Sequence, residues 1–446
     1  MSTKQMTTVS AELQAKIENR TATIGIVGMG YVGLPLAVAV FDAGFPVIGF
    51  DVDDKKIEHL NNGTPYLEHL GNDFAKSFVD SERFLGTTDA TSLANADIIS
   101  ICVPTPLGSH NEPDLTYVLE STRAVAKVLR KGQLIVLEST TYPGTTRDEM
   151  LPILGESGLK HGEDFFLAYS PEREDPGRKS ETTQSIPKLV GGIDESSGTL
   201  AHAFYSTVVD NAHLVSSAEV AESAKLLENI YRAVNIALVN EMKLILDKLG
   251  IDIWEVVDAA ATKPFGFQAF YPGPGLGGHC IPIDPFYLTW KAQEAGMPTR
   301  FIELAGEINQ KMPEIVVDRV ASALNEDGKP LKNAKVLVVG IAYKPDVDDV
   351  RETPAAAIID DLHARGAVVA YHDPHVSEFP TMRKHDIDLT SVPITADSIA
   401  KYDAVLIVTN HTLIDWDLIA TNAQLVIDTR NALANCSDIR CRLVKA

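Results

Sequence analysis

The sequence predicts an α/β protein with two doubly wound halves, joined by a long central helix and a helical middle region. Three observations support this prediction. A glycine-rich turn separates a strand from a helix near Gly28, and a second strand-turn-helix-strand unit runs from Lys335 to Asp373. Between them, apolar residues recur at helical spacing from Ser217 to Leu249.

The first half reads as alternating strands and helices. A strand from Thr23 to Val27, a helix from Leu34 to Ala43 and a strand from Pro46 to Asp51 form a βαβ unit. Further apolar runs predict strands at residues 97–103, 133–138, 165–169 and 188–190. We expect a mostly parallel sheet covered on both faces, in a domain that ends near residue 215.

The middle region is predicted to be helical. Ser216 and Glu219 predict a capping box, and the helix that follows has no Pro or Gly before Gly250. Such a helix is about 50 Å long, more than one domain needs, so we expect it to bridge domains and to offer an oligomer surface. Further helices are expected at residues 254–261 and 301–324, and further strands at 404–409 and 425–428.

Composition and charge exclude several classes of protein. The chain has 446 residues and a net charge of −22, which disfavours nucleic-acid binding. Because it has neither a signal-peptide pattern nor a stretch of about 18 apolar residues, we expect a cytoplasmic protein that does not enter the membrane. The cysteines, which predict neither a disulfide framework nor a zinc site, are Cys102, Cys280, Cys436 and Cys441.

The first turn carries a dinucleotide-binding motif, Gly28-Met29-Gly30-Tyr31-Val32-Gly33. Gly28 permits the turn, Gly30 lets the backbone approach a pyrophosphate, and Gly33 permits close packing of helix on strand. Asp51 ends the next strand, where a carboxylate can accept hydrogen bonds from a ribose and repel the extra phosphate of NADP. The motif therefore predicts NAD as the cofactor, against the alternative of a purely structural turn.

The corresponding turn of the second half, Ile341 to Asp346, is too bulky for a second dinucleotide. It carries Lys344, and Arg351 follows a few residues later. We interpret this turn as a site for a nucleoside diphosphate on the same scaffold.

A glycine-rich stretch from Gly273 to Asp284 presents Cys280 beside His279. Glycines permit strained backbone and close approach of a ligand, so the thiol is a candidate nucleophile. The alternative is an inert buried thiol. One Cys-His pair without a second pair leaves a zinc site incomplete, so we expect no metal.

Other candidate side chains lie on the long helix and after strands. Lys225 and Asn229 share a helix face, with Arg232 one turn further. The lysine is suited to donate to an oxyanion, although it would also fit a surface position. Thr140 and Glu172 each follow a strand, where doubly wound sheets bind ligands, and the alternative for Glu172 is a solvated acid.

Together and in this order, these motifs resemble the UDP-glucose/UDP-N-acetylhexosamine dehydrogenase family, and most closely its UDP-N-acetyl-D-glucosamine 6-dehydrogenase branch. The resemblance implies an NAD-binding Rossmann domain at residues 1–215 and a dimerisation domain with the catalytic cysteine loop at 216–325. It also implies a UDP-sugar-binding, Rossmann-like domain at 326–446. The expected reaction is a four-electron oxidation of a sugar C6 alcohol to a uronate for surface polysaccharide, in a homodimer or larger homo-oligomer.

The resemblance also assigns roles to single residues. Lys225 and Asp284, with a water, assist loss of the alcohol proton, and Cys280 forms a thiohemiacetal and then a thioester. Glu172 and Asp284 are the candidates that activate water, and Thr140, Lys225 and Asn229 position or stabilise the oxyanion. The implied substrate contacts are Glu172, Lys225, Asn229, Arg232, Tyr271, Gly277 and Lys344. The implied cofactor contacts are Gly28, Gly30, Tyr31, Val32, Gly33, Asp51, Pro104, Thr105, Thr140 and Arg351.

Two departures bear on the substrate. Some relatives have a second glutamate where this chain has Pro176, which leaves Glu174 or Asp175 as substitutes. His279 and Ile283 stand where the UDP-glucose branch commonly has Ser and Lys, and both resemble the N-acetylhexosamine branch. UDP-N-acetylglucosamine is therefore the expected substrate, with UDP-N-acetylmannosamine and UDP-glucose as alternatives. A Cys-His thiol hydrolase and a non-enzymatic NAD sensor are the alternatives of a different class.

Overall fold

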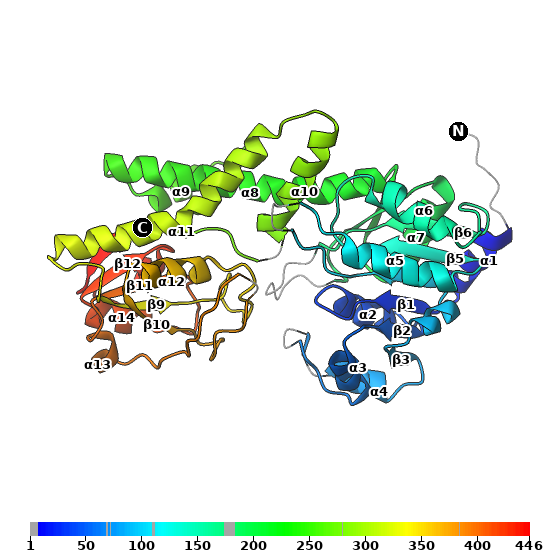
Figure 1. The fold of residues 1–446 in the computed structure, drawn as a ribbon, viewed down its shortest axis with the longest axis horizontal. Helices are drawn as coiled ribbons and strands as arrows, with labels where there is room; N and C mark the ends of the chain where they lie inside the picture. The colour runs from blue at the N-terminus through cyan, green and yellow to red at the C-terminus, as the bar shows by residue number, and fades with distance from the viewer. Residues whose placement is uncertain are drawn as a thin grey trace. The chain divides into compact units, whose positions relative to one another are not determined.

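The computed structural model describes residues 8–67, 70–71, 73–108, 112–173, 183–278, 280–382 and 384–446. The chain divides into two compact units (Figure 1). The first comprises Met1–Glu228 and Phe286–Met297, and the second comprises Asn229–Pro285 and Pro298–Ala446. The division into three domains at residues 215 and 325 stays a prediction.

Eight strands of the described residues form the sheet of the first unit, in the order β3-β2-β1-β4-β5-β6-β7-β8. They are β1 (Ile24–Val27), β2 (Val47–Phe50), β3 (Phe84–Thr87), β4 (Ile98–Ile101), β5 (Gln133–Leu137), β6 (Phe165–Tyr169), β7 (Lys188–Gly192) and β8 (Ala212–Leu214). Neighbouring strands are parallel except β6 and β7. The strand order reverses between β1 and β4, which is where doubly wound sheets bind ligands.

Both faces of this sheet are covered, because every residue of β1, β2, β4, β5 and β6 is buried. Successive residues face different apolar cores: Ile98 packs with α1, α2 and α7, and Ile99 packs with α5 and α6. Each buried Ile or Leu contributes roughly 1.5–3 kcal/mol. The helices are α1 (Thr8–Glu18), α2 (Gly33–Asp42), α3 (Asp54–Asn61), α4 (Asp73–Val79), α5 (Thr116–Val128), α6 (Leu151–Gly155) and α7 (Glu195–Tyr205), with the short turns η2 (Ala90–Asn95) and η3 (Thr145–Met150).

The second unit contains a parallel sheet of five described strands, in the order β10-β9-β11-β12-β13. They are β9 (Lys335–Val339), β10 (Val368–His372), β11 (Ala404–Ile407), β12 (Leu425–Asp428) and β13 (Arg442–Lys445). Residues of α11 and α12 pack in one core, and residues of α13 and α14 in another. The helices and turn are α9 (Ile253–Ala261), α11 (Arg300–Glu326), α12 (Pro354–Ala364), α13 (Ala396–Ile399), α14 (Trp416–Asn422) and η4 (Ala432–Asn435).

The two sheets repeat one device at their first turn. A left-handed glycine follows the first strand of each, Gly28 with φ of 92° and Gly340 with φ of 79°. A carboxylate at the end of the second strand, Asp51 or Asp373, then accepts backbone N–H groups of that turn. The structure confirms the predicted class of two doubly wound, Rossmann-like domains with a helical middle region.

The long helix α8 (Ala218–Leu249) is present as predicted, and at 32 residues it is about 48 Å long. Its cap differs from the prediction. Ser217 Oγ accepts the N–H of Val220 at 3.3 Å, so the N-cap is Ser217. The prediction of a capping box formed by Ser216 and Glu219 is wrong, because the Glu219 carboxylate instead pairs with Arg147.

A further helix, α10 (Cys280–Glu294), begins where the sequence predicts a loop. Pro285 lies inside it, and a proline removes one hydrogen-bond donor from a helix interior, which is why the sequence pattern does not indicate this helix. Cys280 is therefore the first residue of a helix.

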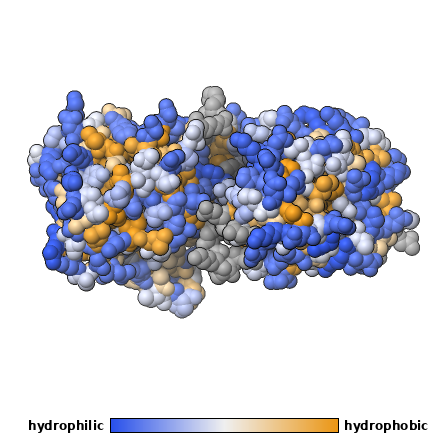
Figure 2. All heavy atoms as spheres, turned by 90° about the horizontal axis from the view of Figure 1, so that it is seen from below, coloured by the Kyte–Doolittle hydropathy of each residue, from blue (hydrophilic) through white to orange (hydrophobic). Residues whose placement is uncertain are grey.

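Hydrophilic residues cover most of the face drawn in Figure 2, with smaller hydrophobic areas between them. Some of the exposed apolar residues lie on α8. We call them the α8 stripe: Val220, Leu227, Tyr231, Leu238, Met242, Ile245 and Leu249. None of the helices in the described ranges combines the length and the apolar character that a bilayer-spanning segment requires.

Candidate active site

The first turn needs glycine at two of its positions. A Cβ atom on Gly28 would lie 2.8 Å from the Cys102 carbonyl oxygen, and one on Gly33 would lie 1.8 Å from the Gly28 carbonyl oxygen. At Gly30, no atom of the described residues lies within 4 Å of the Cβ position, which leaves room for a ligand. The turn thus has the tight packing and the open approach that the motif predicts.

The N-terminus of α2 lies at this turn. Its N-cap residue, Val32, makes no side-chain cap hydrogen bond, and the neighbouring Tyr31 side chain is exposed. Because backbone N–H groups and the helix dipole favour negative charge at a helix N-terminus, this end of α2 is suited to a pyrophosphate.

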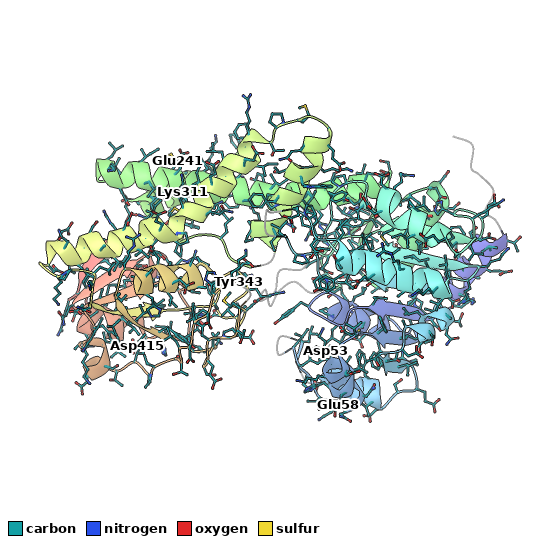
Figure 3. The ribbon with its side chains drawn as sticks, in the orientation of Figure 1. Asp53, Glu58, Glu241, Lys311, Tyr343 and Asp415 are labelled. Atoms are coloured by element: carbon teal, nitrogen blue, oxygen red, sulfur yellow. The ribbon has the colours of Figure 1, made fainter. Side chains whose placement is uncertain are left out.

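Asp51 is buried at the end of β2 and fixes the turn. Its carboxylate accepts the N–H of Met29 at 2.7 Å and that of Asp53, at the start of α3 (Figure 3), at 2.9 Å. Lys56 Nζ lies 3.0 Å from Asp51 Oδ2. The lysine is a cation that the motif did not reveal, because it lies five residues beyond the motif's last position.

The loops after β4 and β5 are joined to each other and to α10. Ser139 Oγ donates to a carbonyl of the loop after β4 at 2.6 Å, and Tyr287 OH donates to the Thr105 carbonyl at 2.9 Å. Thr105 is buried, Pro104 is exposed and Thr140 is half-buried. These candidates therefore lie on neighbouring loops at the carboxyl ends of β4 and β5.

A buried acid of α8 fixes the segment that follows Thr140. The Glu222 carboxylate accepts the N–H groups of Gly144 and Thr146, at 2.7 and 3.0 Å, and the Thr146 hydroxyl at 2.7 Å. Burial raises the pKa of Glu222 above its ordinary value. No motif indicates this role, since Glu222 is one of several acids on a helix.

Four side chains of the first unit form what we call the Lys188 cluster: Glu138, Lys188, Tyr205 and Glu172. Lys188 Nζ lies 2.7 Å from Glu138 Oε2 and 3.8 Å from Glu172 Oε2, and Tyr205 OH donates to Glu138 Oε1 at 2.5 Å. Glu138 and Tyr205 are fully buried, and Lys188 is 5% exposed. Glu172 is thus a partly buried, paired acid, and the surface alternative is wrong.

Burial opposes the charge on Lys188, but the carboxylates of Glu138 and Glu172 raise its pKa well above the ordinary lysine value. Lys188 is therefore a buried cation. Desolvation raises the pKa of Cys102 and of Tyr205, which lie beside Glu138, so both stay neutral at ordinary pH.

Lys225 is buried on α8, and its ammonium donates to the Glu172 carbonyl oxygen. The interpretation as a surface lysine is therefore wrong. Arg173, next to Glu172, pairs with Glu228 of the same helix at 2.7 Å. Two ties from α8 thus hold the segment that carries Glu172.

In the second unit, Asn229 Nδ2 donates to Asp284 Oδ2 at 2.5 Å, and Asn229 Oδ1 accepts from the Arg232 guanidinium. Asn229 and Asp284 are almost fully buried. Because the arginine fixes the oxygen end of the amide, the nitrogen end is directed to the carboxylate. The spacing places Arg232 one turn beyond Asn229, and the hydrogen bond between them is a finding of the structure.

Asp284 follows Cys280 by four residues in α10, about one turn. The side chain of Cys280 and all of His279 lie outside the described residues, and so do Glu174, Asp175 and Pro176. The roles expected for them stay predictions.

The glycine-rich loop before α10 packs against the turn after β9. A Cβ atom on Gly277 would lie 2.5 Å from Tyr343 Cβ, and the N–H of Gly278 donates to the Arg351 carbonyl at 3.0 Å. Tyr343, labelled in Figure 3, precedes Lys344, which is half-buried. The predicted residues Gly277, Lys344 and Arg351 therefore belong to adjoining segments of the second unit.

The side chains of Arg351 and Tyr271 are held by nearby acids. The Arg351 guanidinium pairs with Asp349 at 2.6 Å. Tyr271 is exposed and its hydroxyl donates to Asp258 of α9 at 2.6 Å. To contact a ligand through the same polar atoms, each side chain would have to break its bond to the acid.

The sequence pattern did not indicate two residues that lie against the same loop. The buried Asn240 of α8 accepts the N–H of Gly273 at 3.0 Å and donates to Asn309 of α11 at 3.0 Å. The Arg430 guanidinium, after β12, lies 2.4 Å from the position of a Cβ on Gly273. Burial lowers the pKa of Arg430 to about 10, which leaves it charged at neutral pH.

Among the described residues, Asp346, His375 and His411 form a group with ligand atoms within 4.8 Å of one another. The group suits hydrogen bonding better than a metal ion. His411 Nδ1 accepts the backbone N–H of Asp346 at 3.0 Å, and its Nε2 bonds to the buried Asp373 at 3.0 Å. Both ring nitrogens are thus in use, and the group stabilises the second turn.

Fold and site together define a nucleotide-dependent α/β enzyme with a dinucleotide half and a second nucleotide half. Models of the UDP-glucose/GDP-mannose dehydrogenase family match three segments: its NAD binding domain at residues 22–209, its central domain at 219–311 and its UDP binding domain at 337–435. The chain belongs to this family and is an NAD-dependent oxidoreductase. Membership leaves the thiol-hydrolase and NAD-sensor alternatives without support.

Related sequences and a solved structure are similar to this chain over most of its length. Protein CapL of Staphylococcus aureus is 39% identical over 87% of this chain and 89% of its own length. UDP-N-acetyl-D-glucosamine 6-dehydrogenase of Pseudomonas aeruginosa is 35% identical, over 87% and 90%. The structure of a UDP-D-ManNAc dehydrogenase from Pyrococcus horikoshii has a TM-score of 0.85 at 30% identity, over 95% of this chain and 99% of that one.

Proposed function

We propose that this enzyme oxidises the C6 alcohol of a UDP-N-acetylhexosamine, preferably UDP-N-acetylglucosamine, to the uronate through a covalent bond to Cys280. The sugar alcohol, two NAD⁺ and one water give the uronate, two NADH and three protons. When bound, each of the two NAD⁺ molecules would supply a nicotinamide ring that accepts one hydride. The uronate would serve as a precursor of surface polysaccharide.

In the first oxidation, a base must take the C6 hydroxyl proton as the hydride leaves the carbon. Asp284 is a buried carboxylate with a fixed amide partner in Asn229, which suits a group that passes a proton through a water. Lys225 is a buried ammonium fixed by the Glu172 carbonyl, which suits stabilisation of the developing alkoxide. These two arrangements support the proposed roles most strongly.

In the second oxidation, the Cys280 thiolate adds to the aldehyde carbon, which makes a tetrahedral centre that can lose a hydride. A thioester results. Its hydrolysis needs a base for water, for which we propose Glu172 with Asp284, and donors to the oxyanion, for which we propose Thr140, Lys225 and Asn229.

For the nucleotide, we propose that the UDP group binds in the second unit, on the segments that carry Tyr271, Gly277 and Lys344. The contact of Gly277 with Tyr343 supports this placement, because it brings the glycine-rich loop beside the turn that carries Lys344. For the cofactor, we propose Gly28 to Gly33, Asp51, Pro104, Thr105, Thr140 and Arg351. The open space at Gly30 supports it.

The choice of sugar rests on His279 and Ile283, which differ from the UDP-glucose branch, and on the similarity to relatives named as UDP-N-acetyl-D-glucosamine 6-dehydrogenases. Ile283 is buried in the second unit. Other similar proteins are named UDP-N-acetyl-D-mannosamine dehydrogenases, so the orientation at C2 is the finer part of the proposal.

The test is the rank order of kcat/KM, followed as NADH formation, for UDP-N-acetylglucosamine, UDP-N-acetylmannosamine and UDP-glucose. We expect UDP-N-acetylglucosamine to lead UDP-glucose by about 10- to 100-fold, since one small group is worth roughly 1–3 kcal/mol in a pocket. A lead for UDP-glucose would contradict the branch, and a lead for UDP-N-acetylmannosamine would contradict only the C2 assignment.

A further inference from the structure

We propose that Lys188 is a positioning residue that holds a fixed positive charge beside the Glu172 carboxylate, with Glu138 as its buried anchor. The inference rests on the proposed function, in which Glu172 activates water for thioester hydrolysis. In that step Glu172 takes a proton from water, the water oxygen bonds to the thioester carbon, and the C–S bond breaks to release the Cys280 thiolate.

The geometry separates an anchoring contact from an electrostatic one. Lys188 Nζ is within hydrogen-bond distance of Glu138 Oε2, at 2.7 Å, whereas its 3.8 Å separation from Glu172 Oε2 is too long for a direct hydrogen bond. Glu138 is itself held by the Tyr205 hydroxyl at 2.5 Å. The cation is therefore fixed by Glu138, while its charge still acts on Glu172.

Burial makes this charge effective. Glu138 has no exposed side-chain surface and Lys188 has 5%, whereas Glu172 has 14%. A cation within about 4–6 Å of a carboxylate lowers the pKa of that carboxylate, and the effect is larger where water is excluded. The arrangement therefore puts a permanent positive charge behind the one carboxylate of the cluster that solvent reaches.

Other groups face the Glu172 segment from each element packed against it. From α8, Lys225 donates to the Glu172 carbonyl and Glu228 pairs with Arg173. The Arg173 N–H donates to Glu172 Oε1 at 2.6 Å. The Cys102 thiol and the Tyr205 hydroxyl lie beside Glu138 and stay neutral, because burial raises their pKa values. Lys188 and Glu138 are thus the charges of this cluster that substitution can alter without removing a group of the proposed mechanism.

An active base must be ionised, so the acid limb of kcat against pH reports the ionisation of the base that activates water. Because a nearby cation favours the ionised form of a carboxylate, removal of the Lys188 charge must move the limb to higher pH. Removal of Glu138 alone must move the acid limb to lower pH or leave it unchanged, because it removes a competing negative charge and leaves the cation. A role limited to holding β5 and β7 together would change stability without this pair of opposite shifts.

The experiment compares full-length Glu138→Gln with the double variant Glu138→Gln/Lys188→Met. The double variant buries neither an unpaired lysine nor an unpaired carboxylate, which protects folding. Both are assayed for NADH formation from the best UDP-sugar across pH, beside Lys188→Arg, which keeps a cation, and Glu172→Gln. Thermal unfolding confirms that each variant is folded.

We expect the acid limb of the double variant to lie about one pH unit above that of Glu138→Gln. We expect Lys188→Arg to stay near the wild type, and Glu172→Gln to lose about 100-fold in kcat. If Glu172→Gln loses activity but the limbs of the double variant and Glu138→Gln coincide, the inference falls and the proposed function stands. Should Glu172→Gln keep full activity, the role of Glu172 falls, and the inference falls with it.

Discussion

At the scale of single residues, the proposed four-electron oxidation depends on Cys280. We predict that Cys280→Ala abolishes uronate formation and leaves NAD binding within about twofold of the wild type, because the thiol serves the sugar carbon and not the dinucleotide. Uronate is measured by chromatography and NAD binding by titration calorimetry. Near-normal uronate production by the variant would contradict the covalent mechanism.

Cofactor choice belongs to the same scale. Asp51→Ser removes a negative charge beside the turn and leaves Lys56, which can meet an additional phosphate. We predict that the ratio of kcat/KM for NAD over NADP falls at least about tenfold, equivalent to about 1.4 kcal/mol. Asp53→Ser is the matched control, because Asp53 is exposed and caps α3. Equal turnover of both cofactors by the native enzyme would refute the assignment.

Local patterns predicted the residues whose role depends on a motif. The positions of Gly28, Gly33 and Asp51 follow from strand, turn and helix in one short segment, and the structure shows the contacts expected of a tight turn. Lys188 and Asn240 could not be found in this way. Their partners lie 50 and 33 residues away in the sequence, and each pattern alone reads as an ordinary strand start or helix position.

At the scale of elements, the loop before Cys280 is tied to two helices by Asn240. Asn240→Leu leaves the Gly273 N–H and the Asn309 amide without this partner, at a cost of about 1–3 kcal/mol for each buried group. We predict that KM for the UDP-sugar rises about tenfold while KM for NAD is unchanged, since the loop belongs to the second unit. Asn422→Leu is the control, because Asn422 bonds only within the end of its own helix α14 among the described contacts. An unchanged KM for the UDP-sugar would refute the role of the hydrogen bond between Asn240 and Gly273.

The sequence predicted elements well where periodicity or β-branched runs were strong. The predicted strands, which are those from β1 to β12 except β3 and β8, lie within about two residues of the expected bounds. The same holds for α8. The pattern missed β3, β8 and β13, which are only partly buried and so lack a continuous apolar run. It also missed α10, because two prolines near its start are typical of a loop.

At the scale of the whole molecule, the α8 stripe is the feature that a monomer would leave exposed. Leu227 and Leu249 are 67% and 65% exposed, and the stripe continues along most of the helix. We predict at least a homodimer, with a mass by light scattering of twice 48.3 kDa or more at micromolar concentration. Leu238→Glu with Ile245→Glu should lower the mass towards one chain. A native monomer would refute the prediction.

The central claim is that one active site carries out two oxidations through a thioester on Cys280. The most direct measurement is the amount of NADH formed for each uronate produced, with UDP-N-acetylglucosamine as the limiting substrate. The account predicts two NADH for each uronate and no accumulation of the free aldehyde. One NADH for each product, with the aldehyde released, would contradict it.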